Sequence, residues 1–152
     1  MLAPARTPEE RRQDALKRLE QDVDVWVATA DEATGTPYLV PLSFLWNGTV
    51  LLIATPAASP TGRNLQATGM VRLSLGTTRD VVSIEGTAQT LAAEELSAEI
   101  GDAFAVKTGF DPRELSSYLY FRIRPHRVQA WREVNELNGR ELMRDGRWIV
   151  AN

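Results

Sequence analysis

The segment 55–76 contains the residue types that could bind an anion. It reads TPAASPTGRNLQATGMVRLSLG and joins an expected strand to a turn, a short helix and another strand. Ser59 followed by Pro60 predicts a helix start, because serine accepts a hydrogen bond from a first-turn amide and proline needs no partner for its nitrogen. Arg63 and Asn64 follow one turn into this helix. Free amides, hydroxyls and a guanidinium at such a corner suit a phosphate.

The same window has a simpler interpretation. The apolar run 50–54 predicts a buried strand, and the hydroxyl residues Thr55 and Ser59 bracket Pro56 directly after it. A strand-to-helix connection with a surface arginine explains these residues about equally well, so both interpretations stay open.

The composition excludes several classes of site. The chain has 152 residues, of which 43% are hydrophobic and 24% charged, and this predicts a single domain over residues 1–152. The net charge is −3 and basic residues are spread among acidic ones, so no nucleic-acid partner is expected. The absence of cysteine rules out disulfides, thiolate catalysis and cysteine-ligated metals. With His126 as the single histidine, no multi-histidine metal site is possible, and no metal is expected.

The N-terminal residues 1–19 do not resemble a secretory signal, because no apolar segment follows their basic residues. The chain also lacks an apolar run long enough to cross a bilayer. We therefore expect a cytoplasmic protein with no membrane association.

Periodicity and turn residues predict the order of the elements. A capping box at 7–10 predicts an N-terminal helix that ends near residue 21. Apolar alternation or apolar runs predict strands over 23–30, 38–46, 49–55, 70–75, 81–88 and 118–131, and a last hairpin over 142–150. Pro41 interrupts the second strand, which places that strand at an edge or a bulge. Asn47-Gly48 predicts a tight hairpin.

A second long helix is predicted from 92 to 107, where apolar residues recur at helical spacing before Gly109. Together with a short turn after Asp111 it forms a helical insertion over about 92–117. Strands joined mainly by hairpins predict a mainly β (α+β) fold, a small antiparallel barrel over 22–152. An N-terminal helix, a short helix after the third strand and the longer helix of the insertion complete the fold.

Four local strings and their order resemble the FMN-binding split barrel of the pyridoxamine 5′-phosphate oxidase-like superfamily. They are Gly35-Thr36-Pro37-Tyr38 leading into Pro41-Leu42-Ser43, the Asn47-Gly48 hairpin, the segment 55–65 ending in Arg-Asn-Leu, and Glu85-Gly86-Thr87-Ala88. Each string is weak alone, but together they span the chain from about Asp22 to Trp131.

The resemblance implies a homodimer that binds FMN, or in some branches the deazaflavin coenzyme, in a groove at the subunit interface. It places the cofactor phosphate against a hydroxyl-rich corner that comprises Thr55, Ser59, Thr61, Arg63 and Asn64. It places the isoalloxazine ring along Pro41, Leu42 and Ser43. Trp131 and Arg132 resemble residues that some members bring in from the second subunit, where an indole can cover a ring and arginine can pair with an anion.

The chain departs from the family pattern at two positions. Many relatives carry a lysine or a second arginine where Ser59 and Thr61 stand, which leaves Arg63 as the one cation of the corner. Because a charge-assisted hydrogen bond contributes roughly 1.5–3 kcal/mol, its loss is expected to weaken phosphate binding about tenfold or more. The terminal arginine-rich segment of the vitamin-processing oxidase is also missing, so we do not expect a pyridoxamine phosphate oxidase.

Three functions stay open at this point. The first is an oxidoreductase that binds FMN or the deazaflavin and transfers a hydride to or from a small organic substrate; because the cofactor carries that chemistry, no catalytic residue can be named. The second is a non-catalytic cofactor-binding or carrier protein. The third is a dimer that binds haem or another planar ligand, which a single histidine supports poorly. The sequence leaves open the substrate, the choice between FMN and deazaflavin, and the electron donor.

Several other residues have an ordinary structural interpretation. Trp26, Trp46 and Trp148 are expected to pack in the core or an interface, whereas packing and cofactor contact are equally plausible for Trp131. Alternating arginines between 122 and 127 predict a solvated barrel face. His126 is expected at the surface. Arg79 and Asp80 are expected to form a local turn pair.

Overall fold

The computed structural model describes residues 1–150, and the last two residues of the expected domain lie outside the described part. The helices are α1 (Pro8–Gln21), α2 (Pro60–Thr68) and α3 (Ala98–Thr108), with short 3-10 turns at Ala93–Glu95, Pro112–Glu114 and Val134–Glu136. The strands are β1 (Asp24–Ala30), β2 (Pro37–Ser43), β3 (Leu45–Trp46), β4 (Leu51–Pro56), β5 (Met70–Thr77), β6 (Asp80–Leu91), β7 (Tyr118–Trp131), β8 (Glu141–Arg144) and β9 (Arg147–Trp148). No helix within residues 1–150 is long and apolar enough to cross a membrane.

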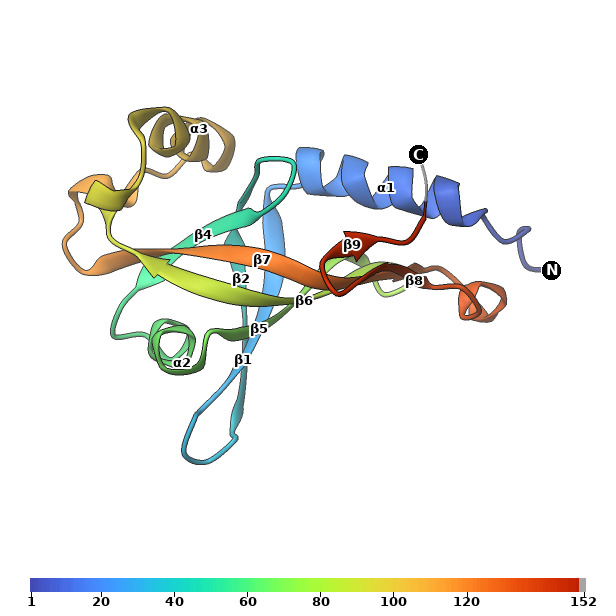
Figure 1. Ribbon diagram of the computed structural model, residues 1–152, viewed down its shortest axis with the longest axis horizontal. Helices are drawn as coiled ribbons and strands as arrows, with labels where there is room; N and C mark the ends of the chain where they lie inside the picture. Colours follow the sequence, from blue (N-terminus) through green and yellow to red (C-terminus); the bar gives the residue numbers. More distant parts are fainter. Residues whose placement is uncertain (151–152) are drawn as a thin grey trace.

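The strands form one antiparallel sheet that curls into a half-barrel (Figure 1). The strand order is β2-β1-β5-β6-β7-β4-β3, and the hairpin of β8 and β9 pairs with the far part of β7. In Figure 1, α1 and α3 lie on one side of the sheet and α2 on the other. The predicted mainly β split barrel with an N-terminal helix is therefore confirmed.

The inner face of the curled sheet carries the main core. Alternate residues of β1, β5 and β6 point inward, as shown by Val25 and Val27, which are almost fully buried. Two helices contribute to the same core, Ala15 and Leu19 from α1 and Leu65 from α2. The burial of these apolar side chains is the main favourable term that holds both helices against the sheet.

Both predicted helix caps are present. The Thr7 side chain accepts a hydrogen bond from the backbone nitrogen of Glu10 at 3.1 Å, and the Ser59 side chain accepts one from Gly62 at 3.0 Å. Each cap satisfies a first-turn N–H group that has no partner within the helix. The start of α2, where the anion corner was predicted, is thus determined locally.

Pro41 lies on the edge strand β2, opposite Trp26, as its missing N–H group predicts. The strand predicted over 38–46, however, is divided at Phe44. The Phe44 side chain is fully buried, and its N–H group donates to the carbonyl of Val23, the residue before β1, where the pairing with β1 ends. The following residues form β3 and pair with β4 instead.

The helix predicted over 92–107 also begins later than expected. A single 3-10 turn is followed by Leu96 in an extended conformation, and α3 starts only after Ser97, whose side chain accepts a hydrogen bond from Ile100. Serine competes for backbone amides in a helix interior and favours a cap position, which explains the later start.

Candidate functional site

A groove of about 360 Å³ opens beside the edge strand β2. It lies between the end of β2, the end of β4, helix α3 and the start of β7, and is lined by Asp24, Pro41, Leu42, Ser43, Ala54, Thr55, Pro56, Phe104, Phe110 and Tyr118. The structure thus brings together Pro41, Leu42, Ser43 and Thr55, four of the residues that the sequence singled out.

An aromatic wall of Phe104, Phe110 and Tyr118 lines one side of the groove, and no sequence pattern assigned it to the site. Phe104 is 2% exposed and packs edge-on against Tyr120, with ring centroids 5.5 Å apart. The rings of Phe110 and Tyr118 are tilted against each other at 5.4 Å. Helical spacing marked Phe104 as a packing residue, but no sequence pattern indicates that α3 folds toward β2. Aromatic side walls favour a planar ligand, because ring faces bury large apolar areas.

The hydroxyl of Ser59 at the start of α2 is already occupied by internal hydrogen bonds. It donates to the carbonyl of Pro56 at 2.8 Å, accepts from the Gly62 nitrogen, and lies 3.3 Å from the Thr55 hydroxyl. Ser59 therefore stabilises the connection between β4 and α2 in addition to any role in binding a ligand.

Asn64 and Arg63 point to different surroundings. The Asn64 side chain is 6% exposed and its Nδ2 donates to the Thr29 hydroxyl at 3.1 Å, so it ties α2 to β1. Arg63 is exposed, and one of its guanidinium nitrogens donates to the Ala58 carbonyl at 2.7 Å. Of the two residues, Arg63 is the one that can turn toward an anion at the corner.

Thr61 carries a buried hydroxyl oxygen that forms no hydrogen bond to the described residues. The residue is 1% exposed and lies in the first turn of α2. A buried hydroxyl without a partner costs free energy, which a ligand oxygen at this corner would reduce. The corner thus offers one cation, Arg63, and one unpaired hydroxyl, Thr61.

Trp131 and Arg132 lie far from this groove within the same chain. Thr55 at the groove pairs with Leu119 near the start of β7, whereas Trp131 ends that strand. At a rise of about 3.3 Å per residue, the twelve positions between Leu119 and Trp131 span about 40 Å. These two residues can reach such a groove only from a second copy.

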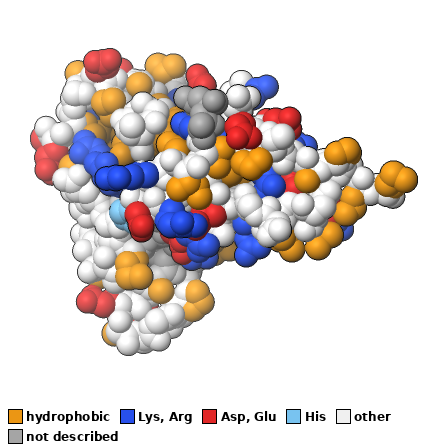
Figure 2. Space-filling model, turned by 45° about the vertical axis from the view of Figure 1, so that its right-hand side comes forward, with side chains coloured by type: hydrophobic (Ala, Val, Ile, Leu, Met, Phe, Trp, Pro, Cys, Tyr) orange, Lys and Arg blue, Asp and Glu red, His pale blue; other side chains and the backbone are white. Residues whose placement is uncertain are grey.

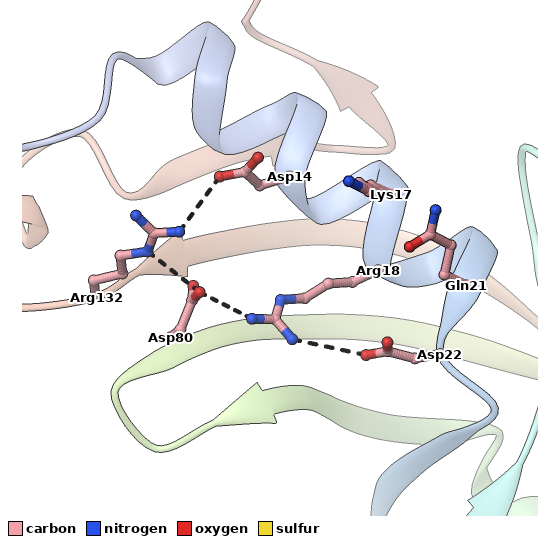
Figure 3. A pocket seen from close by; sticks show the side chains of 7 residues that line it. All are labelled: Asp14, Lys17, Arg18, Gln21, Asp22, Asp80 and Arg132. Carbon is pink, nitrogen blue, oxygen red and sulfur yellow. Dashed lines mark hydrogen bonds and ion pairs between the residues drawn. The ribbon is translucent and has the colours of Figure 1, made fainter.

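Arg132 belongs to a second pocket of about 280 Å³ beside α1 (Figure 3). Asp80 lies at its centre and pairs with Arg18 at 2.9 Å and with Arg132 at 3.2 Å. Arg132 also approaches Asp14 at 3.7 Å, and Arg18 approaches Asp22 at 3.8 Å. Each of these five side chains has an ion-pair partner, so the cluster holds α1 against the sheet.

The expected pairing of Arg79 with Asp80 is wrong. Arg79 pairs with Glu133 at 2.8 Å on the exposed surface, whereas Asp80 opens β6 beside α1 and pairs with the arginines there. Arg79 lies in the turn between β5 and β6, where its side chain pairs with Glu133, whereas Asp80 is the first residue of β6.

A buried ion pair joins the N-terminal segment to the 3-10 turn after β7. Arg6 donates from Nε and Nη2 to the two oxygens of Glu136 at 3.0 and 2.8 Å, and the backbone nitrogens of Arg6 and Arg132 donate to the same carboxylate. Glu136 is 2% exposed. The hydrogen bonds from Arg6 lower the pKa of Glu136 from 4.5 to about 2. No sequence pattern predicts this pair, because 130 positions separate its members.

This pKa shift predicts a defined loss of stability in acid. Because the folded state holds the Glu136 pKa below its unfolded value, the stabilisation is complete above pH 4.5 and is lost as the pH falls toward 2. The shift corresponds to about 3 kcal/mol of unfolding free energy. Urea unfolding at pH 7, 4 and 3 should show this loss in the wild type. The difference between the wild type and Glu136→Gln should shrink over the same pH range, and a constant difference would contradict the assignment.

The outer face of β7 carries Arg122, Arg124 and Arg127, and Figure 2 shows basic side chains near the single histidine. The pairing of β6 with β7 shifts by one residue between Glu85 and Gly86, and this leaves His126 as an extra residue on β7. Arg127 therefore pairs with Glu85 of β6 and, like Arg124, lies on the outer face. Arg127 forms an ion pair with Glu141 at 2.7 Å. The expected solvated face with a surface histidine is confirmed, and His126 is not among the residues that line the groove.

Comparison with known proteins supports the same architecture. A structure described as F420 reductase matches with a TM-score of 0.62 at 18% identity, covering 74% of this chain and 93% of that one. A FAD-binding protein from Mesorhizobium loti matches with a TM-score of 0.65 at 20% identity, covering 86% and 96%. General Stress Protein 26 from Bacillus anthracis matches with a TM-score of 0.58 at 16% identity, covering 81% and 96%. At these identities the likeness shows the fold.

No curated protein matches the chain in sequence. A family model described as pyridoxamine 5′-phosphate oxidase matches residues 13–132, which is well over half of the chain. The match includes the groove, the corner at α2 and almost all of the sheet. The chain therefore belongs to the pyridoxamine 5′-phosphate oxidase family.

Proposed function

We propose that this protein is a flavin-dependent oxidoreductase that binds FMN, or a deazaflavin coenzyme, in the groove beside β2. The observation that carries the proposal is the single groove that joins Pro41, Leu42 and Ser43 to Thr55 and an aromatic wall. Membership of the family, and structural neighbours described as F420 reductase and FAD-binding protein, support a cofactor of the flavin type.

The residues present fit such a group in two respects. The aromatic wall and the aliphatic residues of β2 suit the faces of a planar ring, and the corner at α2 suits a phosphate through Arg63 and the unpaired hydroxyl of Thr61. Ser59 and Asn64 keep the corner rigid by their internal hydrogen bonds. The corner thus binds an anion with one cation, and we expect correspondingly weak retention of the cofactor.

When bound, the cofactor supplies hydride or electron transfer, and the protein supplies position and surroundings. Pro41 to Ser43 provide backbone groups along the edge strand, where β2 has a partner on one side only. Phe104, Phe110 and Tyr118 offer aromatic surfaces on which a bound ring can pack.

We further propose a homodimer in which Trp131 and Arg132 of a second copy complete the groove. The outer face of β1, β2 and β5 exposes large apolar side chains: Trp26 is 49%, Leu39 59% and Met70 72% exposed. Apolar patches of this kind are typical of protein interfaces. Within one chain Trp131 lies too far along β7 to reach the groove, which agrees with the proposal that the Trp131 side chain at the groove comes from another subunit.

A second candidate is a non-catalytic cofactor carrier, and one observation favours it. The hydroxyl of Ser59 and the amide of Asn64 are engaged within the protein, so the phosphate corner has fewer donors than its sequence indicates. A carrier needs only reversible binding, which one arginine can provide.

Titration of the purified protein with FMN and, separately, with the deazaflavin coenzyme tests the proposal, with cofactor fluorescence as the readout. We expect micromolar or tighter binding of one of the two. Bound cofactor that is reduced and reoxidised by a substrate would favour the enzyme over the carrier. No binding of either cofactor would refute the proposed function.

Substitution of Arg63 by alanine is expected to weaken binding of the phosphorylated cofactor by about 10- to 100-fold, because one charge-assisted interaction is lost. Riboflavin, which has the same ring but no phosphate, should bind both proteins equally. The exposed Arg147 on β9 provides a matched control, and Arg147→Ala should leave FMN affinity unchanged. Equal FMN affinity in Arg63→Ala and wild type would rule out the phosphate assignment.

A further inference from the structure

The groove has one charged residue in its wall. Of the described residues that line it, Asp24 is the one carboxylate and none is an arginine, lysine or histidine, and the remainder are apolar, hydroxyl-bearing or aromatic. Within residues 1–150 no arginine or lysine forms an ion pair with Asp24. The negative charge of this carboxylate is therefore not compensated within the groove.

Ser43 fixes the direction of this carboxylate. The two residues pair across β1 and β2, and the Ser43 hydroxyl donates to Asp24 Oδ1 at 2.7 Å. Since a serine hydroxyl has a single proton, the Ser43 oxygen can then only accept a further hydrogen bond. Both side chains thus present hydrogen-bond acceptors, and neither presents a donor.

Asp24 is exposed to solvent, and Phe104, Phe110 and Tyr118 line the same groove. Because water screens the charge in part, its effect is largest on a ligand group that lies directly against the carboxylate. A ligand group that carries a negative charge would be repelled by Asp24 there. A positively charged group, or an N–H group at the edge of a ring, would gain a charge-assisted hydrogen bond.

The anion corner adjoins the groove at Thr55, which lines the groove and whose hydroxyl lies 3.3 Å from that of Ser59. Arg63, the cation of the corner, is not among the residues that line the groove, and its guanidinium donates to the Ala58 carbonyl. Within the groove, the charge of Asp24 is therefore not opposed by Arg63.

We propose that Asp24 makes the groove selective for planar aromatic ligands that carry a positive charge or an N–H donor at the edge facing Asp24. Aromatic anions are rejected at this end. The inference rests on the groove of the proposed function and names the class of ring that this groove accepts, a neutral or cationic nitrogen-bearing aromatic compound.

Three small probes of nearly equal shape test this selectivity without any cofactor: benzamidine is a cation, benzamide is neutral and benzoate is an anion at pH 7. Their dissociation constants can be measured from shifts of the Asp24 and Ser43 backbone amides in a ¹⁵N-labelled sample. We expect benzamidine to bind at least about tenfold more tightly than benzoate, as one charge-assisted hydrogen bond implies. Benzamide should lie between them.

Asp24→Asn should bring the benzamidine and benzoate affinities to within about threefold of each other, and it should weaken benzamide binding less than benzamidine binding. Ser43→Ala keeps the carboxylate and should keep the preference for the cation. Asp22→Asn removes the same charge two positions away, outside the groove, and should behave like the wild type. Thermal unfolding of each variant verifies that the protein is folded.

The inference would be overturned if the wild type bound benzamidine and benzoate with nearly equal affinity, or if Asp24→Asn left the ratio of these affinities unchanged. It would also be overturned if no probe shifted the backbone amide resonances. The cofactor titration separates it from the proposed function. Selectivity for benzamidine without binding of FMN or deazaflavin would support the inference and refute the oxidoreductase proposal. Binding of a flavin without this selectivity would support the oxidoreductase proposal and refute the inference.

Discussion

Replacement of Glu136 by alanine is expected to lower the free energy of unfolding by about 3–5 kcal/mol. The carboxylate is 2% exposed and accepts hydrogen bonds from the Arg6 side chain and from the backbone nitrogens of Arg6 and Arg132. Its removal leaves these donors buried without their acceptor. Asp14 and Asp80 still face the Arg6 guanidinium at 2.8 and 3.6 Å, so we expect the lower end of the range.

Urea unfolding at pH 7 measures this effect. Glu133→Ala is a suitable control, because Glu133 lies three positions away and pairs with Arg79 on the surface. Exposed ion pairs contribute about 1 kcal/mol or less, so the control should remain close to wild type. Similar losses of unfolding free energy in the two variants would show that the buried pair stabilises the protein no more than the exposed pair does.

Replacement of Gly62 by alanine is expected to destabilise the protein, although alanine is the better helix former. A Cβ atom at this position would lie 2.2 Å from the Pro56 carbonyl oxygen and 3.0 Å from that of Ala57. Helix propensity alone would stabilise α2 by up to about 1 kcal/mol. Relief of the clash requires the first turn of α2 to move away from β4, and such overpacking costs about 1–3 kcal/mol. We expect the clash to dominate.

The sign of the change in unfolding free energy decides between the two effects. Ala67→Gly on the exposed part of α2 serves as the control for propensity and should cost about 1 kcal/mol without moving the first turn. Gly62→Ala should in addition weaken FMN binding, since the corner that carries Thr61 and Arg63 is displaced. Increased stability of Gly62→Ala would show that the corner is not tightly packed.

The elements with local signals could be predicted from the sequence. Thr7 and Ser59 cap their helices as expected, and Asn47-Gly48 joins β3 to β4. The proline in β2 correctly indicates an edge strand. These features depend on residues a few positions apart, whose backbone preferences act within a single turn or hairpin. The order of these elements was also sufficient to identify the family, which the match over residues 13–132 confirms.

The boundaries within β2–β3 and before α3 required tertiary information. Phe44 ends β2 because its side chain enters the core, and Ser97 begins α3 although the helical apolar spacing starts earlier. In both places local periodicity continues through the boundary, so the pattern alone cannot locate it.

By itself, the sequence determined most of the strands, the helix caps and the segments that border the site, because each depends on short-range preferences, and the order of these elements indicated the family. Only the tertiary structure decided which side chains meet. It directs Asn64 toward Thr29, brings the aromatic wall of α3 over β2, and places Arg6 against Glu136 across 130 positions. Contacts of this kind depend on how distant segments pack, and packing is set by the whole core and not by any local pattern.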